Sequence, residues 1–597
     1  MSSPYPRGTN DQVTNIALLA LAGGVVLFAA LRAAGSITAW LSGMPEPPGG
    51  LAAGLNVIID PLNPGAALGA PGLNPVLYWV VASMLVIVPT VLAAWLWMRW
   101  RSRKKKPKNV HLIEGVATGT EVSAAAGRKA LLSRAQRLRP SLTRADAKPE
   151  HVGYLIGRAA GQQVWATVED SFLLIGPPRQ GKGLHIVINA ILDSPGPVIT
   201  TSTRPDNLAV TFRARERRGP VAVFDPQHLA PGVPSGLRWS PVRGCEDAFT
   251  AMVRAEGLAS SAGFGSVESG GFWQGKTAEV LHCLLHAAAI DGRDARTLFQ
   301  WAHSPTAARD AVRILSNSPY AVEGWADELE QSINSDPKSR DSIWLGVGLA
   351  FKGLADPRVM DAVTPREDEL FDPEPFLREN GTLYLLGTAE GAGASGALVA
   401  AFIEDVVRVA KVLANDSTKF RLDPPLLLAL DEIGNLAPLP SLPLLMAEGG
   451  GSGITAMPVL QSLAQARTQW GQDKAGIIWG ASIVKIVLGG LAEAKDLTDL
   501  RIMFGERDEE TENVSMDHYG NKSYQRSLRK VPILPEDTIR TMPFGTGIVM
   551  LRSTRPMITD LRKWTERPDA TQLETDADDV ESLIRHASRR PVVPPRT

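Results

Sequence analysis

Two long apolar segments lie near the start of the chain. No ionisable side chain occurs between Gln12 and Leu31, and the stretch IALLALAGGVVLFAAL within it is almost wholly apolar. The second segment, VLYWVVASMLVIVPTVLAAWLWM, is more hydrophobic and ends in a cluster of tryptophans. Because about 20 apolar residues cross a bilayer as a helix and tryptophans gather at its interfaces, the pattern predicts transmembrane helices at 13–35 and 76–98. A cleaved signal peptide is the alternative for the first segment, but its n-region has only one basic residue, Arg7.

Basic residues after the second segment predict how the two helices are oriented. Seven of the ten residues in RWRSRKKKPK, at 99–108, are Arg or Lys. Since such residues stay on the cytoplasmic side of a membrane, we expect both termini and the bulk of the chain to be cytoplasmic. The Gly- and Pro-rich residues 36–75 are then extracytoplasmic. The basic run could instead bind DNA, although topology and anionic lipid account for it without DNA.

Beyond residue 150, short apolar runs alternate with helical patterns. YLIGRAAGQQVWATV reads as two short strands, SFLLI as a third, and LHIVINAIL has apolar residues at helical spacing. Further strands are predicted in GPVITTSTRP, PVAVFDP, GTLYLLGT, PPLLLALDEIGNL, GITAMPVLQS, SIVKIVLGG and GTGIVMLRST. This alternation predicts an α/β fold with a parallel sheet covered on both faces. Residues 244–368 show helical patterns alone and are predicted to form an all-α insertion.

The composition is that of a globular protein, with 44% hydrophobic and 21% charged residues. The formal net charge is −1, so any surface that binds nucleic acid must be local. The two cysteines, Cys245 and Cys283, have no metal-site spacing and are too few for a disulfide framework. We expect both to be reduced thiols.

The octapeptide GPPRQGKG at 176–183 nearly matches the phosphate-binding loop G-x-x-x-x-G-K-[ST]. It lies between a predicted strand and a predicted helix, the context that such a loop requires. Backbone N–H groups there wrap phosphate oxygens, Gly176 and Gly181 allow the close approach, and Lys182 reaches the β- and γ-phosphates. Gly183 stands where a hydroxyl for Mg²⁺ is expected, and a structural turn of similar composition is the alternative. The residues predicted to bind the nucleotide are Gly176, Pro177, Pro178, Arg179, Gln180, Gly181, Lys182, Gly183 and Leu184.

Two carboxylates follow another predicted strand. The run LLLAL leads directly into Asp431 and Glu432, and carboxylates at the end of a buried strand are costly unless they have a function. In phosphoryl-transfer ATPases such an aspartate holds Mg²⁺ or its water, and we expect the glutamate to polarise the attacking water. A solvated acidic turn is the alternative. Gln461 ends the next predicted strand, where it could sense the γ-phosphate or be a polar cap.

Together these motifs resemble those of a known family. The segments GPPRQGKG, TTSTRPD, FDP, GFWQGKTAEVLHCLLHAA, LALDEIGNL and VLQSLAQARTQWG are similar to those of the conjugative type IV coupling proteins. These are the TraD/TraG-like DNA-translocating ATPases of the RecA/FtsK/HerA-like superfamily. The resemblance covers roughly residues 115–565 and the membrane anchor. It implies a RecA-like P-loop NTPase domain with an all-α insertion domain, preceded by two transmembrane helices and held in the bacterial inner (cytoplasmic) membrane.

The resemblance also implies an activity and partners. The family forms membrane-anchored homo-hexameric rings that receive a relaxase-bound single DNA strand and pass it to a type IV secretion channel, using ATP and Mg²⁺. On this basis the catalytic residues are expected to be Lys182, Glu432 and Gln461, and Asp431 is expected to bind the metal.

Two departures from the family pattern bear on this chemistry. Gly183 lacks the hydroxyl, but a water or the hydroxyls of residues 200–203 could fill that position, because Mg²⁺ usually keeps several waters. The loop MAEGGGSGI lacks the arginine that many relatives donate to a neighbouring subunit, a group that contributes on the order of 10³–10⁵ in rate. Candidate substitutes are Arg467, Arg501 and Arg507.

The leading hypothesis is a hexameric ATPase that recruits a relaxase–DNA complex and pumps single-stranded DNA into a type IV secretion channel. The alternatives are a nucleotide-binding docking receptor with little turnover and an FtsK-like translocase of double-stranded DNA. The predicted organisation is a cytoplasmic tail (1–12), transmembrane helix (13–35), extracytoplasmic loop (36–75), transmembrane helix (76–98), basic connector (99–150), RecA-like nucleotide-binding domain (151–243 and 369–565), all-α domain (244–368) and disordered tail (566–597).

Overall fold

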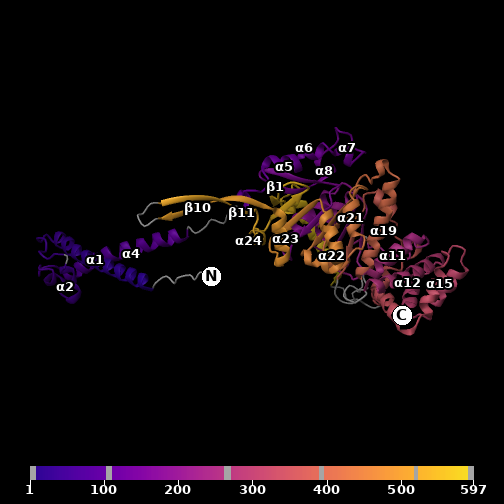
Figure 1. Cartoon of the computed structure of the whole chain (residues 1–597), viewed down its shortest axis with the longest axis horizontal. Helices are drawn as coiled ribbons and strands as arrows, with labels where there is room; N and C mark the ends of the chain where they lie inside the picture. Colours follow the sequence, from indigo (N-terminus) through magenta and orange to yellow (C-terminus); the bar gives the residue numbers. More distant parts are fainter. Residues whose placement is uncertain are drawn as a thin grey trace. The chain divides into compact units, whose positions relative to one another are not determined.

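The computed structural model describes residues 9–50, 52–102, 110–234, 236–260, 270–388, 395–516 and 522–588. The chain forms two compact units, Met1–Asn109 and Val110–Thr597, which are described separately (Figure 1). Most of the basic run, at 103–108, and the ends of the chain, at 1–8 and 589–597, lie outside the described residues.

The first unit is helical. Its elements are α1 (Thr9–Leu41), α2 (Ala53–Ile59), α3 (Pro64–Ala67) and α4 (Pro75–Ser102). α1 and α4 pack together, and the buried Tyr78 hydroxyl of α4 donates to the Leu31 carbonyl of α1 at 2.9 Å. α2 lies directly on α1, since a Cβ at Gly54 would meet the Phe28 carbonyl oxygen at 2.4 Å. The segment 36–75, predicted as a loop, therefore contains two short helices.

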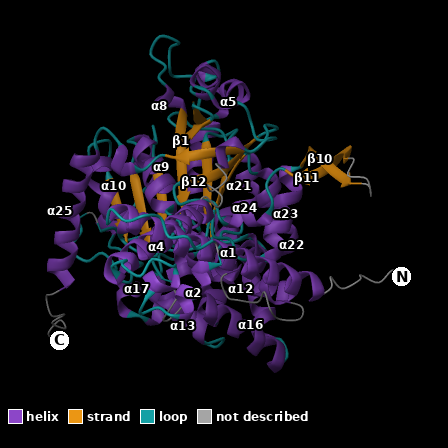
Figure 2. Ribbon diagram, turned by 90° about the vertical axis from the view of Figure 1, so that its left-hand side faces the viewer, coloured by secondary structure: helices purple, strands orange, loops and turns teal. Residues whose placement is uncertain are grey.

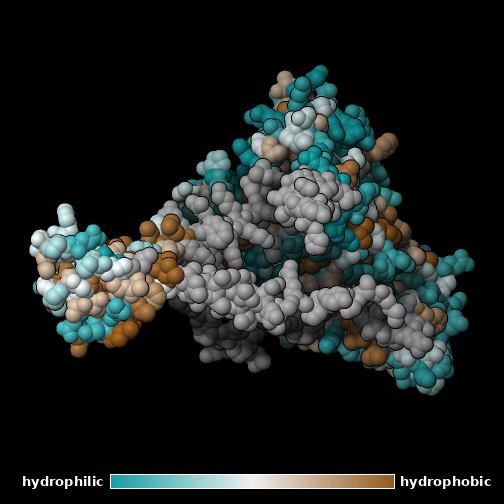
Figure 3. Space-filling view, turned by 60° about the vertical axis from the view of Figure 1, so that its left-hand side comes forward, coloured by the Kyte–Doolittle hydropathy of each residue, from teal (hydrophilic) through white to brown (hydrophobic). Residues whose placement is uncertain are grey.

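Two stretches of this unit are long and apolar enough to cross a membrane, judged by length and composition: Gly23–Leu41 and Pro75–Leu96. Hydrophobic surface is visible on this unit in Figure 3. Large apolar side chains are exposed along the second stretch at Val80, Met84, Ile87, Val88, Val91 and Leu92. An apolar surface of this extent is typical of contact with lipid or with another protein.

The second unit is built on an eleven-stranded sheet in the order β2-β1-β13-β12-β9-β3-β8-β7-β4-β6-β5. Figure 2 shows strands of this sheet with helices around them. From β9 to β5 all neighbouring strands are parallel, whereas β12, β13, β1 and β2 form an antiparallel edge. The predicted α/β fold with a parallel sheet is confirmed, and the antiparallel edge adds to it. The strands of this sheet are β1 (Gly153–Ala159), β2 (Gln162–Thr167), β3 (Phe172–Ile175), β4 (Val198–Ser202), β5 (Val221–Phe224), β6 (Thr382–Leu386), β7 (Leu426–Leu430), β8 (Ile454–Leu460), β9 (Val484–Leu488), β12 (Thr546–Leu551) and β13 (Met557–Leu561).

The central strands are apolar on both faces because helices cover both. In β3, Leu173 and Ile175 belong to one core cluster, and Phe172 and Leu174 belong to another on the opposite face. Strands buried in this way read as continuous hydrophobic runs, which is why SFLLI predicted one. A separate two-stranded ribbon, β10 (Glu506–Met516) and β11 (Lys522–Pro532), was not predicted.

In the part of the stretch between β5 and β6 that the structure describes, the elements are helices, apart from isolated β-bridges at Gly236, Arg238 and Leu370. The helices share the larger core cluster with the sheet, which they join through α19 (Ser395–Asn415). These helices are α11 (Ala248–Ser260), α12 (Gly270–Ile290), α13 (Ala295–His303), α14 (Arg309–Asn317), α15 (Trp325–Asn334), α16 (Pro337–Ala350), η4 (Lys352–Ala355), α17 (Pro357–Ala362), η5 (Glu367–Glu369) and α18 (Pro373–Arg378).

The remaining helices connect strands or follow them. They are η2 (Gly183–Val187), α9 (Ile188–Asp193), α10 (Asp206–Glu216), η6 (Thr418–Phe420), α20 (Ile433–Leu436), α21 (Leu442–Glu448), α22 (Leu463–Ala481), α23 (Ala494–Phe504), α24 (Glu536–Arg540) and η7 (Trp564–Glu566).

The connector predicted at 99–150 is folded from residue 110 onwards. It contains η1 (Val110–Leu112), α5 (Gly119–Ala126), α6 (Arg128–Leu132), α7 (Ala135–Leu138) and α8 (Pro149–Val152). A capping box of Thr118 and Glu121 begins α5, and Val122 and Leu131 are buried against β1 and β2. This segment is therefore part of the second unit rather than a linker.

The prediction of a disordered tail at 566–597 is wrong for 570–588. These residues form α25 (Ala570–Ser588), which packs beside α10 (Figure 2). Leu573, Ala577 and Val580 recur at helical spacing and are buried. The density of acidic residues hid this apolar stripe in the sequence.

Candidate functional site

Four parallel strands bring the predicted site residues to one edge of the sheet. β3 and β8 are in register at Ile175 and Leu460, and the Gly176 N–H donates to the Leu460 carbonyl at 3.0 Å. Gly176 and Gln461 therefore begin adjacent loops. β7 pairs with β4 on its other side, so Asp431 emerges at the same carboxyl edge. Ligands of open α/β sheets bind at this edge.

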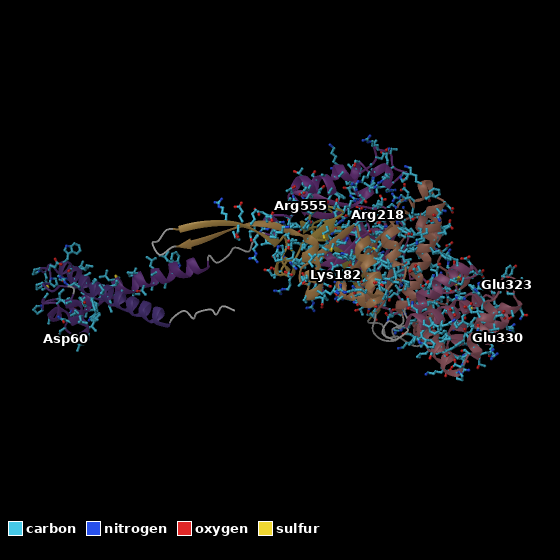
Figure 4. The ribbon with its side chains drawn as sticks, viewed as in Figure 1. Asp60, Lys182, Arg218, Glu323, Glu330 and Arg555 are labelled. Carbon is cyan, nitrogen blue, oxygen red and sulfur yellow. The ribbon has the colours of Figure 1, made fainter. Side chains whose placement is uncertain are left out.

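The phosphate-loop lysine is folded back across its own loop. Lys182 Nζ donates to the carbonyl oxygens of Gly176 at 2.8 Å and Pro177 at 3.3 Å. Burial lowers the pKa of Lys182, while the nearby carboxylates of Asp431 and Glu432 oppose that shift. Lys182, labelled in Figure 4, is thus near enough to both acids for their charges to act on its ammonium group.

The backbone of the loop has the shape of a turn that leads into a helix. Arg179 and Gly181 have positive φ angles of 64° and 77°. A Cβ at Gly181 would lie 2.7 Å from His185 Cδ2, so only glycine fits there. One π-helical turn, η2, starts at Gly183 and continues into α9. Successive N–H groups therefore point out of a helix N-terminus, as phosphate binding requires.

The other predicted loop residues differ in exposure. Pro178 and Arg179 are exposed, whereas Pro177, Gln180 and Leu184 are partly buried. Gln180 packs towards Gly490, where a Cβ would meet its Nε2 at 2.8 Å. The backbone of the loop, more than these side chains, is placed to contact a ligand.

The carboxylates occupy two different environments. Asp431 is partly exposed as a whole, but its carboxylate is desolvated, which raises its pKa to about 6 even though Asn207 Nδ2 donates to its Oδ2 at 3.0 Å. No hydrogen bond reaches the buried Asp431 Oδ1 from the described residues. Glu432 has a positive φ of 51°, and its Oε2 accepts from the Thr203 hydroxyl at 2.6 Å. A buried oxygen without a donor beside a strained glutamate is typical of a functional site.

Gln461 is linked to the acidic pair through a short amide network. Its backbone N–H donates to Gln465 Oε1 at 2.8 Å, and Gln465 Nε2 donates to Asn435 Oδ1 at 2.7 Å. Asn435 lies in α20, directly after Glu432. The loop after β8 and the helix after β7 are thereby joined by side chains.

Three of the side chains at this edge were not predicted as site residues: Asn207, Asn435 and Gln465. Asn207 directly follows the segment TTSTRPD, and Asn435 lies inside LALDEIGNL. Both segments carry the family resemblance, so the quoted motifs contain Asn435 and end directly before Asn207. The segment's charged pair, Arg204 and Asp206, forms an exposed ion pair at 3.3 Å.

Each candidate for the missing arginine is paired within its own chain. Arg467 pairs with Asp496, Arg501 with Glu536 at 2.7 Å, and Arg507 with Glu114 at 2.9 Å. The glycine-rich loop at 449–453 precedes β8 and so lies at the amino edge of the sheet. There the buried Arg421 donates to the Gly450 carbonyl.

Comparisons with known proteins found a family model that matches part of the chain and solved structures with a similar fold. Residues 425–544 match a family model described as the TraM recognition site of TraD and TraG. This region contains Asp431, Glu432 and Gln461 but not the phosphate loop. A search of curated proteins found no match.

Among solved structures, the chain is similar to the bacterial conjugative coupling protein TrwB. It is 17% identical to an unbound form, with a TM-score of 0.52, covering 73% of this chain and 92% of that one. TrwB with a non-hydrolysable ATP analogue (16% identity, 74% and 93% coverage) and with ADP and Mg²⁺ (16%, 74% and 95%) both give a TM-score of 0.52. The predicted resemblance to TraD/TraG-like coupling proteins is confirmed by the matched region and by the fold.

Proposed function

We propose that this chain is a membrane-anchored ATPase that recruits a relaxase–DNA complex and pumps single-stranded DNA into a type IV secretion channel during conjugation. The observation that carries the proposal is the convergence of the phosphate loop and the Asp431–Glu432 pair at one sheet edge of a TrwB-like fold. TrwB itself has been solved with an ATP analogue and with ADP and Mg²⁺.

The residues at the site fit a magnesium nucleotide. Asp431 Oδ1 is a buried acceptor that receives no hydrogen bond from the residues the structure describes, and carboxylate oxygens are ligands that Mg²⁺ prefers. A cation there would also stabilise the ionised carboxylate, which burial alone disfavours. When bound, ATP and Mg²⁺ supply the phosphoanhydride and the charge that offsets its oxygens.

This chain's own residues would then divide the work. Loop N–H groups and Lys182 hold the phosphates, and Lys182 exchanges its two carbonyl acceptors for phosphate oxygens. Glu432, held by Thr203, accepts a proton from the attacking water. Gln461 lies one residue beyond the strand that pairs with β3 and reports phosphate occupancy to Asn435 through Gln465.

The same proposal assigns roles to the membrane helices, to the region that contacts the relaxosome and to the oligomer. The two apolar helices at Gly23–Leu41 and Pro75–Leu96 anchor the chain in the bacterial inner membrane, with the second unit in the cytoplasm. Because the matched region is described as a TraM recognition site, we assign to residues 425–544 a contact with a relaxosome component. Six copies form the ring through which the strand passes.

The test is ATP hydrolysis by the full-length chain in lipid nanodiscs, with and without single-stranded DNA. We expect stimulation by single-stranded DNA and a loss of at least roughly 100-fold in Lys182→Ala and Glu432→Gln, because each removes a group acting on the transition state. Lys352→Ala, at an exposed lysine in η4, is the matched control and should behave as wild type. Stimulation by double-stranded DNA alone would instead favour an FtsK-like translocase.

A docking receptor with little turnover is the second candidate. It is favoured by the arginines, since Arg467, Arg501 and Arg507 are all engaged in ion pairs within their own chain. Turnover by assembled hexamers no higher than in Lys182→Ala, with nucleotide binding intact in the wild type, would support this candidate. Turnover well above that background would exclude it.

A further inference from the structure

Asn207 links the two halves of the site. It is the second residue of α10, which follows β4, the strand next to β7 in the sheet. Its side chain is only 4% exposed, and its Nδ2 donates to Asp431 Oδ2 at 3.0 Å. This buried amide therefore contacts Asp431, the proposed metal ligand, and is placed to supply a second ligand beside it.

The orientation of the amide is determined by its partner. An ionised carboxylate only accepts hydrogen bonds, so the NH₂ group of Asn207 must face Asp431 and the carbonyl oxygen must face away from it. That oxygen points to the phosphate loop, where it lies 3.1 Å from the position of a Cβ on Gly183. Among the residues that the structure describes, none donates a hydrogen bond to Asn207 Oδ1.

Gly183 and Asn207 are therefore complementary. A side chain at position 183 would meet Asn207 Oδ1 at a distance shorter than an ordinary contact, so glycine leaves the space that the carboxamide occupies. Position 183 is also where the phosphate-loop pattern places a hydroxyl for Mg²⁺. The loop thus lacks the hydroxyl oxygen at position 183, and the Oδ1 oxygen of Asn207 in α10 lies close to that position.

We infer that the Asn207 carboxamide oxygen replaces the missing hydroxyl as the second protein ligand of the nucleotide's Mg²⁺, beside Asp431. This inference rests on the proposed function. Amide carbonyl oxygens are suitable ligands for hard divalent cations. The N–H···O bond to Asp431 fixes the orientation of the Asn207 amide, and Asp431 Oδ1 is free of donors among the described residues.

The test measures Mg²⁺ rather than turnover. Fluorescent ADP is bound to the full-length chain in nanodiscs at pH 8, first in EDTA and then with increasing Mg²⁺. For Asn207→Ala we expect the Mg²⁺ concentration at half-effect to rise by roughly 10–100-fold, with ADP affinity in EDTA unchanged. Arg213→Ala is the matched control, because Arg213 lies on the same helix and pairs with Glu216 and Asp579 rather than with a residue of the site.

Two further variants distinguish whether Asn207 binds Mg²⁺ directly or only positions Asp431 through its hydrogen bond. The double variant Gly183→Ser with Asn207→Ala restores a loop hydroxyl and removes the obstructing amide, and should recover Mg²⁺ dependence to within a few-fold of wild type. Asn207→Asp keeps an oxygen but loses the donor to Asp431, and should retain tight Mg²⁺ binding. A purely supporting role predicts the reverse for Asn207→Asp, namely a loss as large as in Asn207→Ala.

The outcomes distinguish this inference from the proposed function. If the wild type binds ADP neither in EDTA nor with Mg²⁺, the proposed function fails. If the wild type binds ADP with Mg²⁺ and Asn207→Ala shows the same Mg²⁺ dependence, only the role of Asn207 is overturned. Should Asn207→Ala fail to fold, Asn207→Asp still decides between the two roles, because ligation and support of Asp431 predict opposite results for it.

Discussion

The carboxyl and amino edges of the same parallel sheet treat their buried polar groups in opposite ways. At the carboxyl edge, Asp431 Oδ1 is buried with no donor among the described residues, and Glu432 is held at a positive φ. At the amino edge, the buried Arg215 donates to the Gly196 carbonyl at 2.7 Å, the Ser194 carbonyl at 3.0 Å and the Thr382 hydroxyl at 2.7 Å.

The amino edge also borders a cavity lined by charged residues. A cavity of about 860 Å³ there is lined by several arginines, among them Arg139, Arg215 and Arg218, the last labelled in Figure 4. Arg139 pairs with Asp423 at 2.8 Å, and Arg218 donates to the Ser194 carbonyl at 3.1 Å. These arginines of the cavity are thus already bound to partners in the same chain, where they stabilise the fold.

This difference between the two edges shows that buried polar groups without hydrogen-bond partners identify a functional site better than the volume of a cavity or the number of charged residues around it. Buried polar groups that have hydrogen-bond partners stabilise the folded chain. Buried polar groups without partners and strained backbone destabilise it, and a bound ligand that contacts them can offset this loss. Substitutions at the two edges should therefore change stability with opposite signs. Three predictions test this contrast, from the largest expected effect to the smallest.

Arg215→Met should destabilise the second unit by about 3–6 kcal/mol, because at least two strong hydrogen bonds from a charged donor are lost and their acceptors stay buried. Burial lowers the pKa of Arg215 to about 10, so the side chain is charged at neutral pH and this loss applies there. Thermal unfolding of the full-length chain in nanodiscs, in EDTA and without nucleotide, measures the effect.

The matched control for Arg215→Met is Arg204→Met. Arg204 forms only an exposed ion pair at the carboxyl edge, where such pairs contribute about 0–1 kcal/mol. An equally small effect of Arg215→Met would contradict the view that the amino edge is structural.

Asp431→Asn should stabilise the nucleotide-free chain at pH 8 while it removes Mg²⁺-dependent nucleotide binding. Burial raises the pKa of Asp431 from 3.8 to about 6. A raised pKa means that this group favours folding below about pH 4 and that the benefit is lost as the pH rises to about 6. Above pH 6 the ionised form costs about 3 kcal/mol, which the neutral amide avoids.

Asp423→Asn is the counterpart at the amino edge. Burial acts to raise the pKa of Asp423, but hydrogen bonds from Ser141 and Arg139 outweigh it, and the pKa is lowered. Its stabilisation is present above the unfolded pKa and lost in acid, so Asp423→Asn should destabilise at pH 8. Unfolding temperatures of both variants at pH 5 and pH 8 should move in opposite directions; a common direction would abolish the contrast between the edges.

The parts of the fold that were predicted are those whose pattern depends on neighbours in sequence. Strands such as β3 are apolar on both faces, and helix α9 follows with its own periodicity. The ribbon β10–β11 was missed because its residues are polar on both faces and show no alternation. The helix α25 was missed because one acidic segment masks three buried apolar positions.

The site was predictable residue by residue but not as a constellation. Lys182, Asp431, Glu432 and Gln461 were named from motifs, and the structure brings their loops to one edge. The relation between Gly183 and Asn207 could not be read from the sequence. It depends on how α10 lies against the phosphate loop, which only tertiary packing determines.

The smallest effect concerns backbone strain. Arg179 is exposed and has a φ of 64°, so Arg179→Gly should relieve left-handed strain and stabilise the chain by up to about 1 kcal/mol. Ala160, with a φ of 47° in the turn between β1 and β2, offers the same substitution far from the nucleotide in sequence and sheet position. Ala160→Gly should give a similar gain in unfolding temperature but leave ADP affinity unchanged. Arg179→Gly should weaken ADP binding by roughly 2–5-fold, because a freer loop must be ordered on binding. Equal ADP affinities in the two variants would show that the strain at Arg179 does not preorganise the loop.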